Sequence, residues 1–334
     1  MSVLSRPAIL LVSASVAAGL LVAPAAAYAA DTTTDLSASQ MKAAVAAVAA
    51  ATDTAAVRGW ASDLDLDLTI RGRTATAWQK TATDPEHGLL AASFAMDGQP
   101  ASSVFLDEGA GFYRSVEDDS RITAALTMIG RPTATFVFTP DTDLTLKKDG
   151  PAPLDLVTTS VSAGTRTLHD DGSADLTFTD EQLGVVTLHA DAASVLTTAS
   201  TASKDDEQTL SMSVDYAYGP QLVTLPAADV TVDDKTLAKG VAYLDMARLV
   251  RESAVNGAAS TRRASKGGKV KVATLRKLVR RDAAQSNWYA GDVQVVKVKN
   301  ITAGVRVHAT NPWTKKTVAY TVKASGKKVL VKKS

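Results

Sequence analysis

The chain has 334 residues, of which 46% are hydrophobic, and its formal net charge is only +1. That value hides two opposite halves, because residues 31–232 carry 29 carboxylates against 12 Lys and Arg, whereas residues 233–334 carry 6 against 23. There are no cysteines, which excludes disulfides, thiolate chemistry and cysteine-based metal sites. The change of charge near residue 232 indicates a boundary between an acidic domain and a basic domain.

The first 29 residues have the pattern of a secretory signal peptide. Arg6 precedes an apolar run over residues 9–22, and Ala27-Tyr28-Ala29 fits a cleavage site with small flanking residues. We therefore expect a secreted, extracytoplasmic protein from which residues 1–29 are removed. Retention of this segment as a membrane anchor is the alternative. A lipid anchor is not expected, because the cysteine that would carry it is missing.

The acidic domain, residues 30–232, begins with a helix and continues as strands. Ser37 and Gln40 form a capping box ahead of an alanine-rich helix. In Trp60–Ile70, apolar residues alternate with three aspartates, as in a half-buried strand. The aspartates either bind a cation or form a solvated face that discourages edge-to-edge pairing. Further alternating runs, interrupted by a short helix over residues 120–129, predict a meander of antiparallel strands.

The end of the acidic domain carries a short motif. A strand over residues 209–218 leads into Gly219-Pro220 and an extended Val-x-x-Pro run. This run and the order of helix, meander, short helix and further strands resemble the LppX/LprG-type actinobacterial lipoproteins, which belong with the LolA/LolB-like half-barrels. The likeness covers residues 37–232, and the family's lipobox cysteine has no counterpart here. The motif is matched by Tyr218, Gly219, Val223, Pro226 and Ala227.

The resemblance implies an α+β fold, with a curved antiparallel half-barrel packed with helices and a concave face that holds acyl chains. The alternative is an ordinary filled core, because both arrangements need apolar residues at alternate strand positions. The residues expected to line the concave face are Leu66, Leu68, Trp78, Phe94, Met96, Val104, Leu106, Leu126, Ile129, Phe136 and Phe138.

For the basic domain, residues 233–334, the sequence predicts a smaller unit of two helices followed by a β-meander. We expect a first helix that ends at Asn256-Gly257, a loop over residues 258–271, a second helix over residues 272–284 and four strands between residues 293 and 332. Several outward strand positions are basic: Lys297, Lys299, Arg306, Lys315, Lys316, Lys323, Lys327 and Lys328.

This positive charge predicts an anionic partner, either lipid headgroups or an acidic wall polymer. Nucleic acid is not expected outside the cell. The alternative is intramolecular, with the basic domain docked on the acidic one. The side chains expected to contact the partner are Arg262, Arg263, Lys266, Lys269, Arg276, Lys277, Arg280 and Arg281.

Motifs for catalysis are absent from the sequence. It has no G-x-S-x-G, no phosphate-binding loop and no G-x-G-x-x-G. The histidines lack the i, i+4 spacing of a zinc pair, and we expect each to be solvent-exposed: His87, His169, His189 and His308. We therefore predict no enzyme, no metal site and no cofactor.

Two functions remain. The first is a secreted envelope protein that carries a lipid or another long apolar ligand, while its basic domain contacts an anionic envelope component. The alternative is a non-enzymatic interaction protein with a solid core, which binds a protein or a wall polymer through its charged surfaces.

Overall fold

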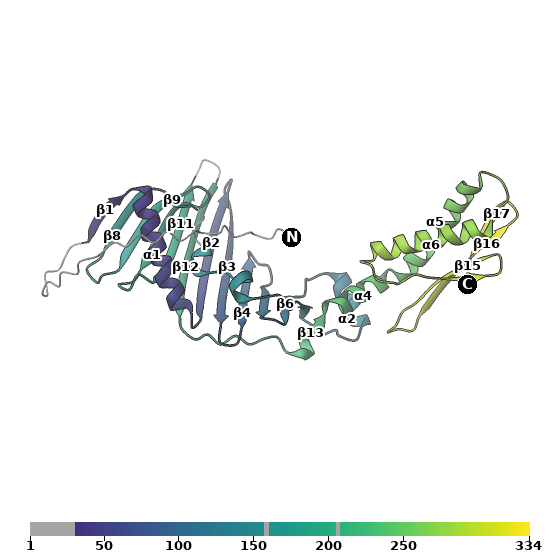
Figure 1. Cartoon of the computed structure of the whole chain (residues 1–334), viewed down its shortest axis with the longest axis horizontal. Coiled ribbons are helices and arrows are strands. Elements are labelled where there is room, and N and C mark those ends of the chain that lie inside the picture. The colour runs from purple at the N-terminus through teal and green to yellow at the C-terminus, as the bar shows by residue number, and fades with distance from the viewer. Residues whose placement is uncertain (1–30, 157–159, 205–207) are drawn as a thin grey trace.

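The computed structural model describes residues 31–156, 160–204 and 208–334. The expected signal peptide, residues 1–29, lies outside the described residues. A large curved sheet with helices forms one end of the molecule, and a smaller unit of helices and strands forms the other (Figure 1). This arrangement confirms the predicted α+β fold. Within the described ranges, no helix is both long and apolar enough to cross a membrane.

The large sheet does not close into a barrel, and β1 and β13 are its two edges. Its neighbouring strands are antiparallel except for β13, which runs parallel to β7. The strands of the described chain follow one another across the sheet as β1 (Thr32–Leu36), β8 (Gly164–Leu168), β9 (Ala174–Asp180), β10 (Gly184–Ala190), β11 (Leu196–Lys204), β12 (Gln208–Tyr218), β2 (Trp60–Ile70), β3 (Arg73–Asp84), β4 (Leu89–Met96), β5 (Ser102–Asp107), β6 (Gly111–Ser115), β7 (Phe136–Pro140) and β13 (Thr231–Asp233).

Four helices pack on one face of this sheet, which we call the helix face. Helix α1 packs on Val214, α3 packs near Leu106, and α2 and α4 pack on Val137. The register of the strands places these three residues on the same face. We call the opposite side the outer face. The helices and 3₁₀ turns are α1 (Ala38–Ala56), α2 (Ser120–Met128), α3 (Leu146–Asp149), η1 (Pro153–Leu156), η2 (Ala228–Val230) and α4 (Asp234–Leu244).

Helix α1 begins at the predicted capping box. The Ser37 hydroxyl accepts a hydrogen bond from the Gln40 backbone N–H, and the Gln40 side chain accepts one from the Ser37 backbone. The helix buries Met41, Val45 and Val48 against the sheet. Its predicted start and its inward face are therefore both confirmed.

The smaller unit packs two helices on one face of a four-stranded antiparallel sheet. The predicted break at Asn256-Gly257 is wrong, because α5 continues to Ser265 and the break lies at Asp245 instead. Most of the predicted loop 258–271 is therefore helical. A Cβ on Gly257 would lie 2.8 Å from the Val279 Cα, so this glycine allows close helix packing rather than ending a helix. The elements are α5 (Met246–Ser265), α6 (Val272–Tyr289), β14 (Lys297–Ile301), β15 (Gly304–Thr310), β16 (Thr317–Ser325) and β17 (Lys328–Lys333).

The two parts of the molecule meet around α4. This helix packs on α2 beside the large sheet, and its residues Ala242 and Tyr243 join the core of the smaller unit. The Arg121 side chain of α2 also forms an ion pair with Asp245, at 2.6 Å.

Candidate functional site

Six of the residues predicted to line a concave face lie together on the helix face. The pairing of β2 with β3, of β3 with β4 and of β4 with β5 places their side chains on the side where the helices pack. These six residues are Leu66, Leu68, Phe94, Met96, Val104 and Leu106.

Three others lie on the outer face. Trp78 is directly across the ladder from Asp65, on the side of the aspartates. Phe136 contacts Phe105, with ring centroids 5.6 Å apart, and Phe138 contacts Tyr113 at 4.7 Å. Trp78, Phe136 and Phe138 therefore cannot line a site with the other six.

The last two predicted lining residues belong to the core between α2 and α4. Leu126 is 4% exposed and packs with Ile129, Leu237 and Val241. Leu126 and Ile129 are thus separated from the six residues on the helix face.

The helix face is filled where α1 covers it. Met41, Leu188 and Leu196 are fully buried there, and Thr52 of α1 accepts a hydrogen bond from the Leu196 backbone N–H at 3.0 Å. A second small core lies under α3, where Leu90 and Leu106 are buried. The region under α1 has the close-packed character of an ordinary protein interior.

Elsewhere on the helix face, apolar side chains near the ends of β2 and β4 remain exposed. Phe94 is 48% exposed, Met96 is 59% exposed, and Ile70 at the end of β2 is 46% exposed. Leu66 and Leu68 lie next to them and are partly buried. We call Leu66, Leu68, Ile70, Phe94 and Met96 the apolar strip.

Two cavities lie along the same strands. The Trp60 cavity has a volume of about 670 Å³ and is lined by Val57, Trp60, Leu90 and Pro153, among others. The Ile70 cavity, at the other end of β2, has about 620 Å³ and includes Leu68, Arg71 and Arg73 in its lining. At the rise of a β-strand, the ends of β2 are roughly 33 Å apart.

An aromatic group supports the wall of the Trp60 cavity. The Trp60 ring lies 6.3 Å from the Tyr216 ring, and the Tyr216 hydroxyl donates to the Pro153 carbonyl at 2.9 Å. Burial raises the pKa of Tyr216 and of Tyr218, so both remain neutral donors at physiological pH. The sequence prediction missed Trp60 and Leu90, although both occupy the same alternating positions as the residues it named.

The outer face carries the three aspartates of β2. Asp63 forms an ion pair with Lys80 at 2.8 Å, while Asp65 and Asp67 are exposed. This arrangement matches a solvated face, the second of the two interpretations considered for the sequence.

In the smaller unit, three of the arginines predicted to contact an anionic partner bind their own domain. Arg262 donates to the Val329 carbonyl, Arg276 to the Ile301 carbonyl, and Arg280 to the Asn300 side chain. A fourth, Arg281, pairs with Asp282 at 3.2 Å. The bonds of Arg262, Arg276 and Arg280 connect α5 and α6 to the small sheet. The remaining members of the predicted set are exposed: Arg263, Lys266, Lys269 and Lys277.

The opposite side of the small sheet carries a denser group of cations. Lys299, Arg306 and Lys332 lie in one row across β14, β15 and β17, with Thr321 of β16 between them. In the described residues none of these cations is paired with a carboxylate. We call this group the basic sheet face; its members are Lys297, Lys299, Arg306, Lys323, Lys328 and Lys332.

The histidines differ in exposure, so the expectation that each is solvent-exposed is wrong. His87 is exposed and pairs with Asp84, but the His169 side chain is only 24% exposed. His169 and His189 both contact Asp175, because the strands that carry Asp175 and His189 are neighbours in the sheet.

Comparisons with known proteins give weak structural neighbours. No protein-family model and no curated protein matches this chain. An uncharacterized conserved protein from Thermus thermophilus is 10% identical, with a TM-score of 0.30 over 57% of this chain and 98% of that one. An outer membrane lipoprotein-sorting protein domain from Vibrio parahaemolyticus is 10% identical, with a TM-score of 0.20 over 56% and 97%.

The MucA/MucB complex of Pseudomonas aeruginosa contains a further neighbour. It is 10% identical, with a TM-score of 0.24 over 84% of this chain and 75% of that one. At these identities and TM-scores, the similarities assign neither a family nor a function to this chain. The weak neighbours include a lipoprotein-sorting domain, and the narrower likeness to LppX/LprG-type proteins stays a prediction.

Proposed function

We propose that this chain is a non-enzymatic, extracytoplasmic protein that binds a lipid or another long apolar ligand along the apolar strip. One observation carries the proposal. Phe94 and Met96 are about half exposed although they lie on the face where the helices pack and most apolar side chains are buried. An apolar ligand in this position would take their surface out of water.

The dimensions of the site suit a chain-like ligand. Each cavity is within the range of about 300–1,000 Å³ that is typical of small-molecule sites. Each methylene group that is removed from water contributes about 0.8 kcal/mol, so an acyl chain on the strip would bind through many small gains. Arg71 and Arg73 border the Ile70 cavity and favour an anionic headgroup at that end.

The smaller unit has a separate role in this proposal. The basic sheet face provides six cations on one side of the small sheet, and it would hold the protein at an anionic envelope component. The rival hypothesis is an interaction protein that binds another protein or a wall polymer through its charged surfaces. The close packing under α1 fits that hypothesis, whereas the exposed apolar strip favours the carrier.

The proposal is tested by searching the purified protein for a bound lipid and by substituting a residue of the apolar strip. Residues 30–334 would be purified, extracted with organic solvent and examined by native mass spectrometry for a bound lipid. Uptake of a fluorescent fatty acid would then be measured for the wild type and for Phe94→Arg. We expect Phe94→Arg to lose at least tenfold in affinity, because it places a charge in the path of the chain.

Trp78→Arg is the matched control, since Trp78 lies on the outer face of the neighbouring strand. It should bind the fatty acid as the wild type does, and circular dichroism should show that both variants are folded. Leu126→Arg is unsuitable as a probe, because it would place a charge in the closed core between α2 and α4. A protein that is isolated empty and takes up no fatty acid would refute the carrier.

A further inference from the structure

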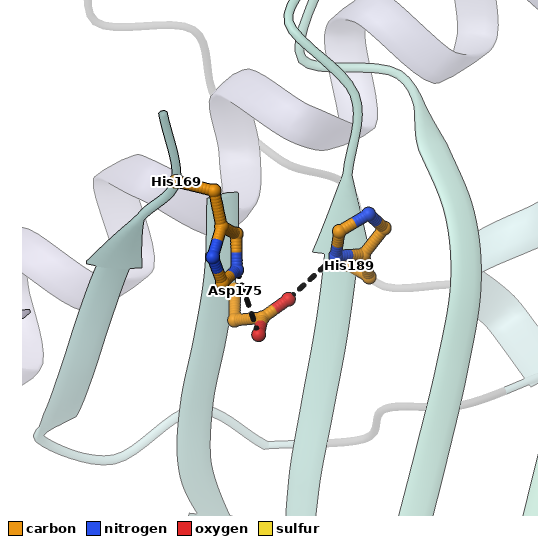
Figure 2. A group of neighbouring side chains, drawn as sticks. All are labelled: His169, Asp175 and His189. Carbon is orange, nitrogen blue, oxygen red and sulfur yellow. Dashed lines mark hydrogen bonds and ion pairs between the residues drawn. The ribbon is translucent and has the colours of Figure 1, made fainter. Parts of the chain in front are cut away.

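A cluster of two histidines and an aspartate lies on the outer face, far along the sheet from the apolar strip. His169 follows directly after β8, Asp175 lies on β9, and His189 lies on β10 directly across the ladder from Asp175. Figure 2 shows both imidazoles turned toward the Asp175 carboxylate. One oxygen of Asp175 is 3.1 Å from His169 Nε2, and the other is 2.6 Å from His189 Nδ1.

The geometry points to a divalent transition-metal site, and we propose that His169 Nε2, His189 Nδ1 and Asp175 together bind Zn²⁺. One ligand atom from each residue lies within 4.8 Å of the others. Ligand atoms around a tetrahedral Zn²⁺ are about 3.4 Å apart, so the present atoms need to approach one another by at most about 1.4 Å, which small side-chain rotations allow. Two imidazoles and a carboxylate are ligands that Zn²⁺ accepts, and water would complete the coordination.

A second carboxylate is placed as metal sites require. Asp31 Oδ2 lies 3.1 Å from His169 Nδ1, the nitrogen that would remain protonated when Nε2 binds the metal. Metal-binding histidines commonly donate their other ring N–H to a carboxylate, which orients the ring. Asp31 is thus an orienting group for His169, not a ligand.

A metal ion at this position would stabilise the edge of the large sheet. Asp31 directly precedes β1, which is an edge strand of the large sheet and pairs with β8. A bound ion would connect the end of β8 to β9 and β10, and through His169 and Asp31 it would also hold β1. The side chains of His169, Asp175 and His189 are 24%, 32% and 38% exposed, so an ion has access from solvent.

The experiment measures Zn²⁺ binding by residues 30–334 without a histidine tag, after treatment with a chelator. Isothermal titration with zinc chloride should give one site per chain, and an excess of a hundredfold over Kd should raise the Tm by roughly 5 °C. His189→Ala and His169→Ala should each weaken binding by at least about tenfold. His87→Ala is the matched control, because His87 pairs with Asp84 and lies with no second histidine in the part of the chain that the structure describes, and it should bind as the wild type.

Asp175→Asn and Co²⁺ keep the proposal testable if an alanine variant fails to fold. The amide of Asn keeps the size of the side chain but removes the negative ligand, so Zn²⁺ affinity should fall while the circular dichroism spectrum stays unchanged. Co²⁺ in the wild type should give visible absorption bands that Asp175→Asn loses. No Zn²⁺ uptake at millimolar concentration, or equal uptake by the wild type and the cluster variants, would overturn the site.

Discussion

One carboxylate, Asp245, connects three elements of the fold. It lies between α4 and α5, and it forms ion pairs with Arg121 of α2 at 2.6 Å and with Arg248 of α5 at 3.3 Å. Burial alone would raise its pKa, but hydrogen bonds from Arg248 and Arg121 and their positive charges outweigh this effect. The pKa of Asp245 is therefore below its ordinary value, and its ionised form stabilises the folded state.

This linkage predicts how Asp245→Asn changes stability with pH. A carboxylate with a lowered pKa stabilises the fold above its unfolded pKa of about 3.9, and this contribution is lost as the pH falls through the folded value. We expect the variant to be destabilised by about 1 kcal/mol or less at pH 7, since Asp245 is partly exposed, and by less at pH 3, which lies below the unfolded pKa. Urea unfolding at both pH values measures the difference.

Glu252→Gln serves as the control for Asp245→Asn. Among the described residues Glu252 pairs only with Arg248, at 3.1 Å on the surface of α5. Its loss should cost less than that of Asp245, about 0.3 kcal/mol, which is typical of exposed pairs four residues apart on a helix. Equal losses for the two variants, or a loss for Asp245→Asn that is undiminished at pH 3, would contradict the role of the two arginines.

The alternation of residues in the strands was predictable, but the face on which a residue lies depends on register. For Trp78 a signal existed, because Arg71-Gly72 is a two-residue turn with positive φ at both positions, which pairs Ile70 with Arg73. Counting from this pair places Trp78 across from Asp65, on the outer face. For Phe136 no such signal exists, since α2 separates its strand from β6 and leaves the register open.

At the scale of whole elements, the packing of α5 on α6 depends on a glycine inside a helix. A Cβ at Gly257 would lie 2.7 Å from Val279 Cγ2 and 2.8 Å from Val279 Cα, so part of the clash is with the backbone. Sequence patterns associate Asn-Gly with a helix end because glycine is a poor helix former. Here contact with a second helix overrides that preference, and this contact is not visible in the sequence.

Gly257→Ala should therefore destabilise the smaller unit. Alanine gains about 1 kcal/mol in helix propensity, but pushing the two helices apart costs about 1–3 kcal/mol. We expect a net loss of about 1 kcal/mol, measured by chemical unfolding.

Combining Gly257→Ala with Val279→Ala tests whether the loss of stability comes from contact with Val279. Val279→Ala removes the contact with Val279 Cγ2 but leaves those with the Cα at 2.8 Å and the Cβ at 3.1 Å, so it should only partly rescue Gly257→Ala in a double-mutant cycle. A Gly257→Ala variant more stable than the wild type would show that the helices have room to move.

For the molecule as a whole, the charge difference between the two halves was evident in the sequence, but its arrangement was not. The predicted cations on α5 and α6 include Arg262 and Arg276, which bind carbonyls of their own sheet. The concentrated positive surface is instead on the far side of that sheet, where strand pairing aligns residues such as Lys299 and Arg306. Pairing likewise brings together His169 and His189, which are 20 residues apart in the sequence.

The basic sheet face predicts binding to anionic membranes that depends on salt. Each Lys or Arg near an anionic surface contributes about 1 kcal/mol, so reversing Lys299, Arg306 and Lys332 to Glu should weaken binding to anionic vesicles by about 100-fold or more. The matched control reverses Lys266, Lys269 and Lys277 and should have a smaller effect. Binding should fall sharply at 1 M salt, where the Debye length is about 3 Å, and it should be absent with zwitterionic vesicles. Co-sedimentation of residues 30–334 with the vesicles measures the effect of the variants and the effect of salt. Equal losses of binding for the two triple variants would mean that the net charge of the protein, and not the basic sheet face, controls binding.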